Sequence, residues 1–381
     1  MLGETMARNR KILIYTPAMT GGGAERVCAL LASGFARAGD DVILAVDFQS
    51  PDNAAYVDAA VRIVVLGQPH GKAIAALARL LKTEKPDVSL SALGISNLKH
   101  LVAAGLAGRL HRAILSYHGF FSGEPQPLSR LSYLLTPLAT RLAAATICVS
   151  DSLRAALVSR FWASARRTVR IYNPVEARVA DAPAQKSPPM VLAVGRLVAD
   201  KNFAGLVRAF ALLDNRQAQL VILGEGPERG AIAAEIARLG LGDRVKLPGY
   251  VSQPWAYYSQ ASCLAMSSRL ETFSLVVVEA LANGLPVVST LCGGPPEILD
   301  FGRFGRLVPY DDAPAMARAI DASLAMPGDP TPRLARAREF GLAVALENYG
   351  QLFDLVCLRE NAGNMAVPGD DARHDGKAAA I

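Results

Sequence analysis

The sequence of 381 residues lacks long hydrophobic runs and the patterns typical of metal sites or disulfide frameworks. None of its apolar stretches reaches the roughly 18 residues that a membrane-spanning helix needs. Its five cysteines are scattered and form no CxxC pair, which argues against both disulfides and zinc. Its five histidines show no HxxxH spacing. We therefore predict no metal site.

A secretion signal is also lacking near the N-terminus. The apolar stretch that follows Lys11 is only as long as a strand, and no small-residue cleavage site comes after it. We therefore expect a cytoplasmic protein.

The positive charge is concentrated in the first half of the chain. Residues 1–183 hold 21 Lys/Arg against 13 Asp/Glu, whereas the remainder holds 19 against 21. A basic half is suited to an anionic partner such as an acidic membrane surface or a lipid diphosphate, although a solvated surface explains it equally well. No nucleic-acid-binding motif accompanies the charge, so we predict no nucleic-acid partner. The segment from Leu98 to Arg112 combines apolar and basic residues and is the predicted membrane-docking face.

Strand and helix patterns alternate through the first half. Strands are predicted at residues 11–15, 41–46, 61–66, 87–91 and 113–117, and helices at 24–38, 72–82 and 98–106. This alternation is typical of a parallel, doubly wound sheet. In such sheets, ligands bind in the crevice at the carboxyl ends of the strands.

A polar, proline-rich segment at about residues 175–190 predicts a linker. The alternation then restarts, with strands predicted at 191–194, 219–223, 245–247, 263–265, 286–289 and 305–308, and helices at 203–213, 229–238, 313–324 and 333–358. The polar residues 359–381 are expected to form a disordered tail. We thus predict an α/β protein with two doubly wound, Rossmann-like domains, residues 1–178 and 179–358, facing a central cleft.

A glycine loop, Thr20-Gly-Gly-Gly-Ala-Glu25, joins the first predicted strand to its helix. Glycines let the backbone approach a ligand closely, and a helix N-terminus offers free N–H groups to an anion. Gly22 and Gly23 are therefore candidate ligand contacts. A tight turn without function is the alternative.

Two cations occupy the equivalent loop of the second half, Gly195-Arg-Leu-Val-Ala-Asp-Lys-Asn202. Arg196 and Lys201 would both face the cleft, where a diphosphate accepts charge-assisted hydrogen bonds. A solvated loop is the alternative.

The sequence ETFSLVVVE places Glu271 in a loop and Glu279 eight residues later on a helix. Two carboxylates beside a helix N-terminus match a sugar nucleotide, because they accept hydrogen bonds from hydroxyls while the amides donate to phosphate. Two surface glutamates are the alternative. For Glu279, which follows three valines, that alternative is poor because a carboxylate in apolar surroundings needs a partner.

Together these segments resemble the retaining GT-B glycosyltransferases of family 4. The resemblance rests on GGGAERV, GRLVADKN, GEGP, ETFSLVVVE, GLPVVST and GGPPEI, and it spans roughly residues 10–358. It implies a UDP- or GDP-sugar donor, UDP favoured, bound mainly by the second domain without a metal ion or other cofactor. The first domain would then bind the acceptor.

The resemblance also implies roles for single residues. Arg196 and Lys201 would bind the diphosphate, Glu271 the sugar hydroxyls and Glu279 the ribose, and the backbone of Val251 would contact the base. The other implied donor contacts are Gly22, Gly23, Thr272, Phe273, Ser274 and Leu275. His118 matches a histidine that many members have near the anomeric centre, so the candidate catalytic residues are His118, Arg196, Lys201 and Glu271. Thr272 and Ser274 depart from the family, which often has glycine at both positions.

The implied function is transfer of a hexose-type sugar to an acceptor hydroxyl with retention of anomeric configuration. A lipid-linked or cell-surface glycan is the expected acceptor, as in polysaccharide or lipopolysaccharide synthesis, at the inner face of the membrane. Two alternatives share the architecture, a UDP-sugar 2-epimerase and a non-catalytic protein. Intact Arg196, Lys201, Glu271 and Glu279 argue against the second.

Overall fold

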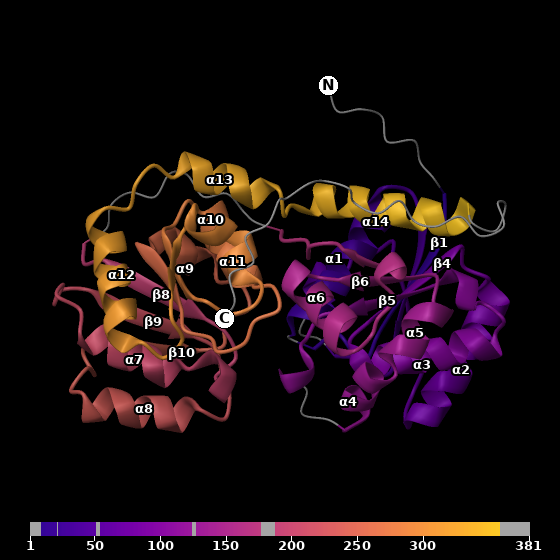
Figure 1. Cartoon of the computed structure of the whole chain (residues 1–381), viewed down its shortest axis with the longest axis horizontal. Helices are drawn as coiled ribbons and strands as arrows, with labels where there is room; N and C mark the ends of the chain where they lie inside the picture. The colour runs from indigo at the N-terminus through magenta and orange to yellow at the C-terminus, as the bar shows by residue number, and fades with distance from the viewer. Residues whose placement is uncertain (1–8, 21, 51–53, 124–126, 177–186, 359–381) are drawn as a thin grey trace.

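The structure is a computed structural model that describes residues 9–20, 22–50, 54–123, 127–176 and 187–358. Two parallel β-sheets, each with helices packed around it, lie side by side along the long axis of the molecule (Figure 1). Among the described residues, no helix is both long and apolar enough to cross a membrane. The predicted tail, Gly21 of the glycine loop and most of the predicted linker lie outside the described residues.

The first sheet has seven parallel strands in the order β3-β2-β1-β4-β5-β6-β7. Its strands are β1 Lys11–Thr16, β2 Asp41–Val46, β3 Arg62–Val65, β4 Val88–Ala92, β5 Ala113–Tyr117, β6 Ala145–Cys148 and β7 Thr168–Arg170. The helices are α1 Gly23–Arg37, α2 His70–Glu84, α3 Gly94–Leu106, α4 Pro127–Leu134, α5 Thr136–Leu142 and α6 Asp151–Arg160. The central strands are buried on both faces, as their continuous apolar runs predict.

The second sheet has six parallel strands in the order β10-β9-β8-β11-β12-β13. Its strands are β8 Met190–Val194, β9 Gln219–Leu223, β10 Val245–Gly249, β11 Cys263–Met266, β12 Val287–Thr290 and β13 Arg306–Val308. The helices are α7 Phe203–Ala211, α8 Arg229–Arg238, α9 Trp255–Gln260, α10 Leu275–Ala282, α11 Pro295–Ile298 and α12 Ala313–Ala325. The predicted α/β class with two doubly wound sheets is confirmed.

The sequence patterns did not predict β6, β7, α4, α5, α6, α9 or α11. Strand β7 has only three residues, two of which are Thr168 and Arg170. In α4 and α5 the leucines face solvent while small and polar residues face the core, so hydrophobic periodicity does not mark the buried side.

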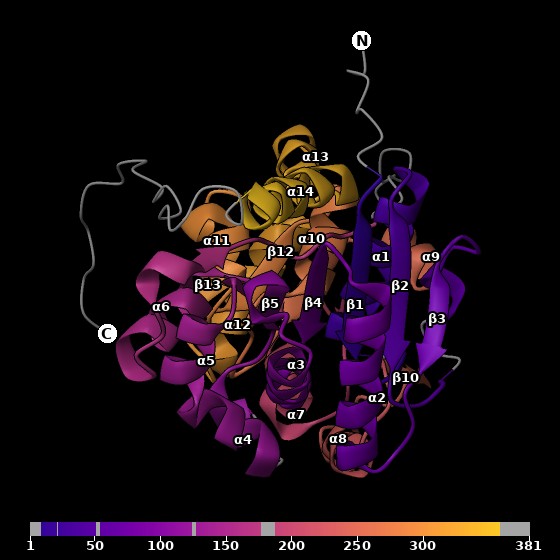
Figure 2. The ribbon, with the colours of Figure 1, turned by 90° about the vertical axis from the view of Figure 1, so that its right-hand side faces the viewer.

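The prediction of one helix over residues 333–358 is wrong. The structure has two helices, α13 Thr331–Arg338 and α14 Leu342–Leu358, because the chain breaks at Gly341 and pairs there with Val175. Beyond the break, α14 returns to the first domain and packs on α1 (Figures 1 and 2). The Phe353 ring lies 5.2 Å from the Phe35 ring of α1. The last helix thus ties the two halves of the chain together.

Candidate donor-binding cleft

Both sheets reverse their strand order at the point where the candidate loops begin. In the first sheet, the glycine loop follows β1, whose neighbours β2 and β4 lie on opposite sides of it. In the second sheet, the Arg196 loop follows β8 and the Glu271 loop follows β11, its neighbour in the sheet. Such switch points are where open α/β sheets bind ligands, because adjacent loops there diverge to opposite faces.

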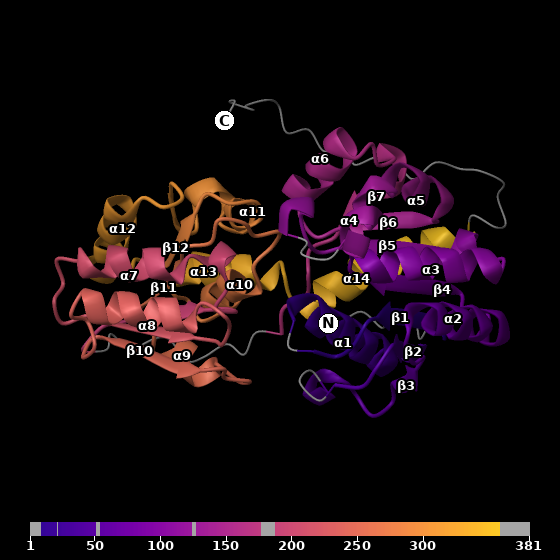
Figure 3. The ribbon, with the colours of Figure 1, turned by 90° about the horizontal axis from the view of Figure 1, so that it is seen from below.

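Candidate residues from the two domains meet across the cleft. The Thr272 hydroxyl donates to the His118 carbonyl oxygen at 2.6 Å. A Cβ added to Gly23 would lie 3.3 Å from the Leu275 side chain, so the N-terminus of α1 contacts the N-terminus of α10. These two helices lie on facing sides of the domains (Figure 3). The structure therefore brings both predicted loops and His118 together.

Lys201 and Glu271 form an ion pair at the centre of the second domain's loops. Lys201 ends a short 3-10 helix, Ala199–Lys201, and its carbonyl oxygen accepts a hydrogen bond of 2.8 Å from the Ser267 hydroxyl. Arg196 lies earlier in the same loop, and its side chain is exposed. Within the described ranges Arg196 has no ion-pair partner within 4.0 Å, which leaves its charge available to an anionic ligand.

Close backbone contacts hold these loops in place. A Cβ on Gly224 would lie 1.9 Å from the Gly195 carbonyl oxygen, and one on Gly226 would lie 2.4 Å from that of Leu197. The glycines of GEGP thus make room for the Arg196 loop. Gly294 does the same for the Glu271 loop, because a Cβ there would lie 2.4 Å from the Thr272 carbonyl oxygen.

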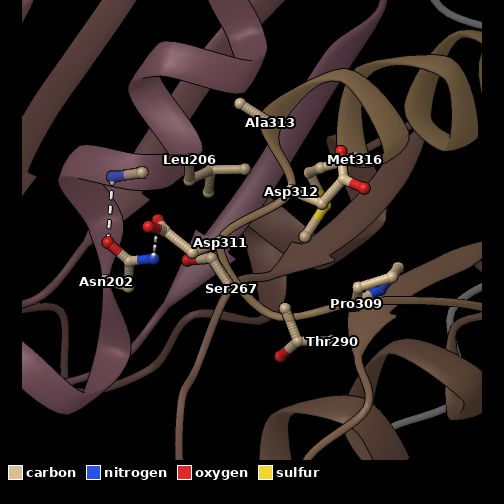
Figure 4. Close-up of a pocket in the computed structure, with 10 residues that line it drawn as sticks. Asn202, Leu206, Ser267, Thr290, Pro309, Asp311, Asp312, Ala313 and Met316 are labelled. Atoms are coloured by element: carbon tan, nitrogen blue, oxygen red, sulfur yellow. Dashed lines mark hydrogen bonds between the residues drawn. The ribbon is translucent and has the colours of Figure 1, made fainter.

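Behind the Lys201 loop is a small pocket of about 10 Å³, room for at most one water (Figure 4). The Asn202 side chain accepts from the Gly205 amide at 3.2 Å and donates to Asp311 at 3.1 Å. These bonds fix the residue that follows Lys201. The pocket is too small for a sugar nucleotide, so it supports the loop and is not itself the donor site.

Helix α10 begins after a strained residue. Ser274 precedes it with φ 120° and ψ 91°, in a region that L-residues other than glycine rarely adopt. Ser274 stands where the family often has glycine. The turn thus keeps a positive φ that favours glycine, although the residue is a serine.

Ser274→Gly is expected to raise the free energy of unfolding by about 1 kcal/mol, because it removes the cost of a side chain at positive φ. Ser274→Ala is the matched control, since it also removes the hydroxyl but keeps the Cβ. Chemical denaturation of the three proteins measures the effect. A glycine variant no more stable than the alanine variant would contradict it.

Glu279 is buried and already has two partners. Its carboxylate accepts a hydrogen bond of 2.8 Å from Arg26 of α1 and one of 2.6 Å from the Tyr258 hydroxyl. The Glu279 side chain is 2% exposed. The Arg26 guanidinium also lies over the rings of Tyr56 and Trp255, at 4.7 and 5.7 Å. A ribose can therefore reach Glu279 only if Arg26 moves. No sequence pattern singled out Arg26, although it lies beside Glu25 in the glycine-loop motif.

His118 follows β5, and burial lowers its pKa to about 4. The imidazole is therefore neutral near pH 7. Its Nε2 atom is hydrogen-bonded to the Ser116 hydroxyl at 2.9 Å, whereas Nδ1 is buried and has no partner among the described residues. A ring nitrogen without a partner is available to donate a hydrogen bond to a substrate hydroxyl or to accept one from it, depending on the tautomer.

Glu25, which no sequence pattern singled out either, lies at the same end of α1. Burial raises its pKa, and the Thr20 hydroxyl, which donates at 3.0 Å, and the nearby charge of Arg196 oppose this only in part. Its carboxylate folds back over Gly22, where a Cβ would lie 2.2 Å from Oε2. The Glu25 carboxylate thus lies at the edge of the cleft, near Arg196, the cation predicted to bind phosphate.

Glu25→Gln is expected to be more stable than the original protein at pH 7.5, and this advantage should shrink as the pH falls toward 4.5. A folded-state pKa above the unfolded value means that ionisation of Glu25 disfavours folding. Glu235→Gln is the control with the opposite sign, because hydrogen bonds from Arg238 lower the pKa of Glu235. Melting temperatures from pH 4.5 to 7.5 measure both. Parallel profiles for Glu25→Gln and the original protein would refute the prediction.

Val251 follows β10 and packs, partly buried, against the same hydrophobic core as Trp255. In the part of the chain that the structure describes, no three His, Cys, Asp or Glu side chains gather as a metal-binding group does.

Two family models match the chain and meet at the linker. Residues 21–179 match the model of Glycosyltransferase Family 4, and residues 176–341 match Glycosyl transferases group 1. The chain belongs to the family 4, group 1 glycosyltransferases. The two models follow the two sheets of the structure.

Relatives and solved structures agree with this membership. The chain is 33% identical over 173 residues to N-acetylgalactosamine-N,N'-diacetylbacillosaminyl-diphospho-undecaprenol 4-alpha-N-acetylgalactosaminyltransferase of Campylobacter jejuni, which is 44% of this chain and 47% of that protein. It is 34% identical over 137 residues to the lipopolysaccharide core biosynthesis glycosyltransferase LpsE of Rhizobium meliloti, 36% of this chain and 40% of that protein. The chain thus matches less than half the length of these two relatives.

The fold is shared with HepE of Anabaena, solved in complex with UDP and glucose. The TM-score is 0.76 at 20% identity, over 91% of this chain and 99% of that one. The GT-B architecture expected from the resemblance is confirmed.

Proposed function

We propose that this protein is a retaining glycosyltransferase that moves a hexose-type sugar from a nucleotide diphosphate donor, UDP favoured over GDP, to an acceptor hydroxyl. The observation that carries the proposal is the Lys201–Glu271 pair. It lies at a strand-order switch point, opposite the first domain's glycine loop, in the same group of loops as Arg196, which has no ion-pair partner among the described residues. This combines cations for a diphosphate with a carboxylate for sugar hydroxyls.

In this proposal Arg196 and Lys201 bind the diphosphate, and the amides of Phe273, Ser274 and Leu275 assist at the N-terminus of α10. When Lys201 binds the diphosphate, its ion pair with Glu271 breaks. The Glu271 carboxylate can then accept hydrogen bonds from sugar hydroxyls. At the other end of the donor, the backbone of Val251 contacts the base. Glu279 binds the ribose after Arg26 has moved away.

The reaction breaks the bond between the anomeric carbon and the diphosphate oxygen and forms a bond to the acceptor oxygen on the same face. Negative charge develops on the leaving diphosphate, and preorganised cations and amides stabilise it. The leaving phosphate oxygen takes the proton of the acceptor hydroxyl. Neutral His118 holds a hydroxyl near the anomeric centre through Nδ1. No covalent carboxylate intermediate is required, unlike in retaining glycosidases.

The names of the similar proteins support the choice of substrates. HepE was solved with UDP and glucose, and the Campylobacter jejuni relative is named for a diphospho-undecaprenol substrate. We propose a lipid-linked or cell-surface glycan as the acceptor. The cytoplasmic location, the membrane contact and the absence of a metal requirement stay predictions.

Thermal-shift measurements with UDP, GDP and their sugars test the donor, because a ligand that binds only the folded protein raises its melting temperature. UDP is expected to stabilise the protein more than GDP. A melting temperature unchanged by all nucleotides would refute the proposal. Once a donor is known, the proton NMR spectrum of the product tests retention, and donor consumption without an acceptor would favour the epimerase alternative.

A further inference from the structure

Helices α4 and α5 carry a row of exposed leucines. Leu131, Leu134, Leu138 and Leu142 are 39%, 62%, 56% and 41% exposed. Their spacing of three, four and four residues places them on one helical face. The two helices are almost continuous, because the Leu135 amide donates to the Leu131 carbonyl and the Ala139 amide to that of Leu135. We call these four residues the leucine stripe.

The opposite face of the same helices is the one that packs on the domain. Ser132, Tyr133, Thr136, Ala139 and Thr140 are buried there. The amphipathic pattern is thus inverted: small and polar side chains face the protein and leucines face outward. Folding does not account for four outward leucines on one face, whereas an apolar partner does.

An exposed tryptophan lies close to the C-terminal end of the leucine stripe. Trp162 is 72% exposed, and its carbonyl oxygen accepts a hydrogen bond of 3.2 Å from Arg141 of α5. Ser164 is joined to Thr140 of α5 by a further bond of 2.9 Å. The segment after α6 therefore lies against α5, at the surface of the first domain (Figure 2).

The segment that carries the stripe and Trp162 is strongly basic. Residues 127–170 contain seven arginines and a single acid, Asp151. Arg130, Arg141, Arg160 and Arg166 are exposed. Leucine and tryptophan beside arginine are typical of helices that lie in the interface of a membrane with anionic lipids.

We propose that the leucine stripe, with Trp162 and its surrounding arginines, docks this protein on an anionic lipid bilayer. Charge decides between a bilayer and a second copy of the chain. A symmetric dimer through this face would bring two arginine-rich surfaces together, and like charges oppose such contact. A bilayer rich in acidic lipids complements the same surface.

The docking face adjoins the acceptor side of the cleft. On the buried side of α4, the Tyr133 hydroxyl donates to the Gly119 carbonyl oxygen, next to His118. A lipid-linked acceptor held in the bilayer would thus reach the cleft along α4. Only this last step rests on the proposed function, because bilayer binding itself needs no sugar transfer.

The docking face lies elsewhere than the sequence suggested. In the segment from Leu98 to Arg112, Val102 and Leu106 are exposed, but the lysine and both arginines are buried or half-buried. Lys99 is buried and paired with Asp47, and Arg109 donates to the Pro86 carbonyl oxygen. This part of α3 lies beside α4, so its two apolar residues border the docking face without supplying its charge.

Vesicle flotation of the full chain tests the proposal. The protein is expected to float with vesicles of equimolar phosphatidylcholine and phosphatidylglycerol at low salt, and to bind pure phosphatidylcholine much less. Leu134→Ser with Leu138→Ser should reduce binding at least ~10-fold, because each side chain loses its apolar contact with the bilayer. Leu212→Ser with Leu358→Ser is the matched control, since these leucines are 52% and 60% exposed outside the stripe. It should bind like the original.

A second variant tests the electrostatic part. Arg130→Gln with Arg166→Gln should weaken binding to the anionic vesicles and make it less sensitive to salt. Melting temperatures and nucleotide-induced shifts confirm that every variant is folded. Absence of flotation at low salt, equal loss in the control pair, or a dimer in solution that depends on Leu134 and Leu138 would overturn the proposal. Nucleotide binding that persists in such a result would leave the proposed function standing.

Discussion

Lys201→Ala is expected to lower kcat for sugar transfer roughly 100-fold or more while the protein remains folded. Lys201 is the cation that the proposed mechanism places on the leaving diphosphate, and removing one preorganised group from a developing anion typically costs about 100- to 1000-fold. The variant also leaves Glu271 without its partner, so its carboxylate loses its fixed orientation. Acceptor-dependent release of the nucleoside diphosphate, with the donor found by thermal shift, measures the effect.

Lys246→Ala makes the same change in charge at an exposed position on β10 and is the control. It should keep near-normal turnover, and both variants should keep the original melting temperature to within a few degrees. Turnover of Lys201→Ala close to that of Lys246→Ala would show that the leaving group does not depend on Lys201. The ion pair with Glu271 would then be structural.

Gly294→Ala is expected to lower the free energy of unfolding by about 1–3 kcal/mol, because it overpacks a contact between two backbone segments. The new Cβ would lie 2.4 Å from the Thr272 carbonyl oxygen and 2.7 Å from the Phe273 Cα. Gly294 has φ −73° and ψ −35°, which alanine adopts freely, so the effect comes from the contact alone. The loop of Glu271 must shift, and kcat/KM for the donor should fall at least ~10-fold.

Gly230→Ala is the matched control, because nothing lies within 4 Å of its added Cβ in helix α8. It should raise stability by about 0.5–1 kcal/mol, since alanine is the better helix former. Denaturant unfolding and donor kinetics are measured on both variants. If the contact at Gly294 matters, the free energy of unfolding falls in Gly294→Ala and rises in Gly230→Ala. A Gly294→Ala protein with unchanged stability would mean that the loops of β11 and β12 do not press on one another.

Most of the regular fold was predictable because the strands of a parallel sheet are buried on both faces. Continuous apolar runs therefore marked strands such as β2 and β9, and glycines and prolines marked their ends. Residues 118–175 were harder, since α4 and α5 turn their leucines to solvent. The break at Gly341 was missed because it depends on pairing with Val175, which lies far away in the sequence.

The sequence by itself determined which residues are candidates for the site and on which loops they lie. Glycines, cations and carboxylates stand at fixed distances from their own strands, so local pattern was enough to select Arg196, Lys201, Glu271 and Glu279. Their partners were decided by the tertiary structure. Arg26 covers Glu279 and Thr272 reaches His118 because two sheets face each other, and contacts between chain segments more than 150 residues apart leave no local pattern.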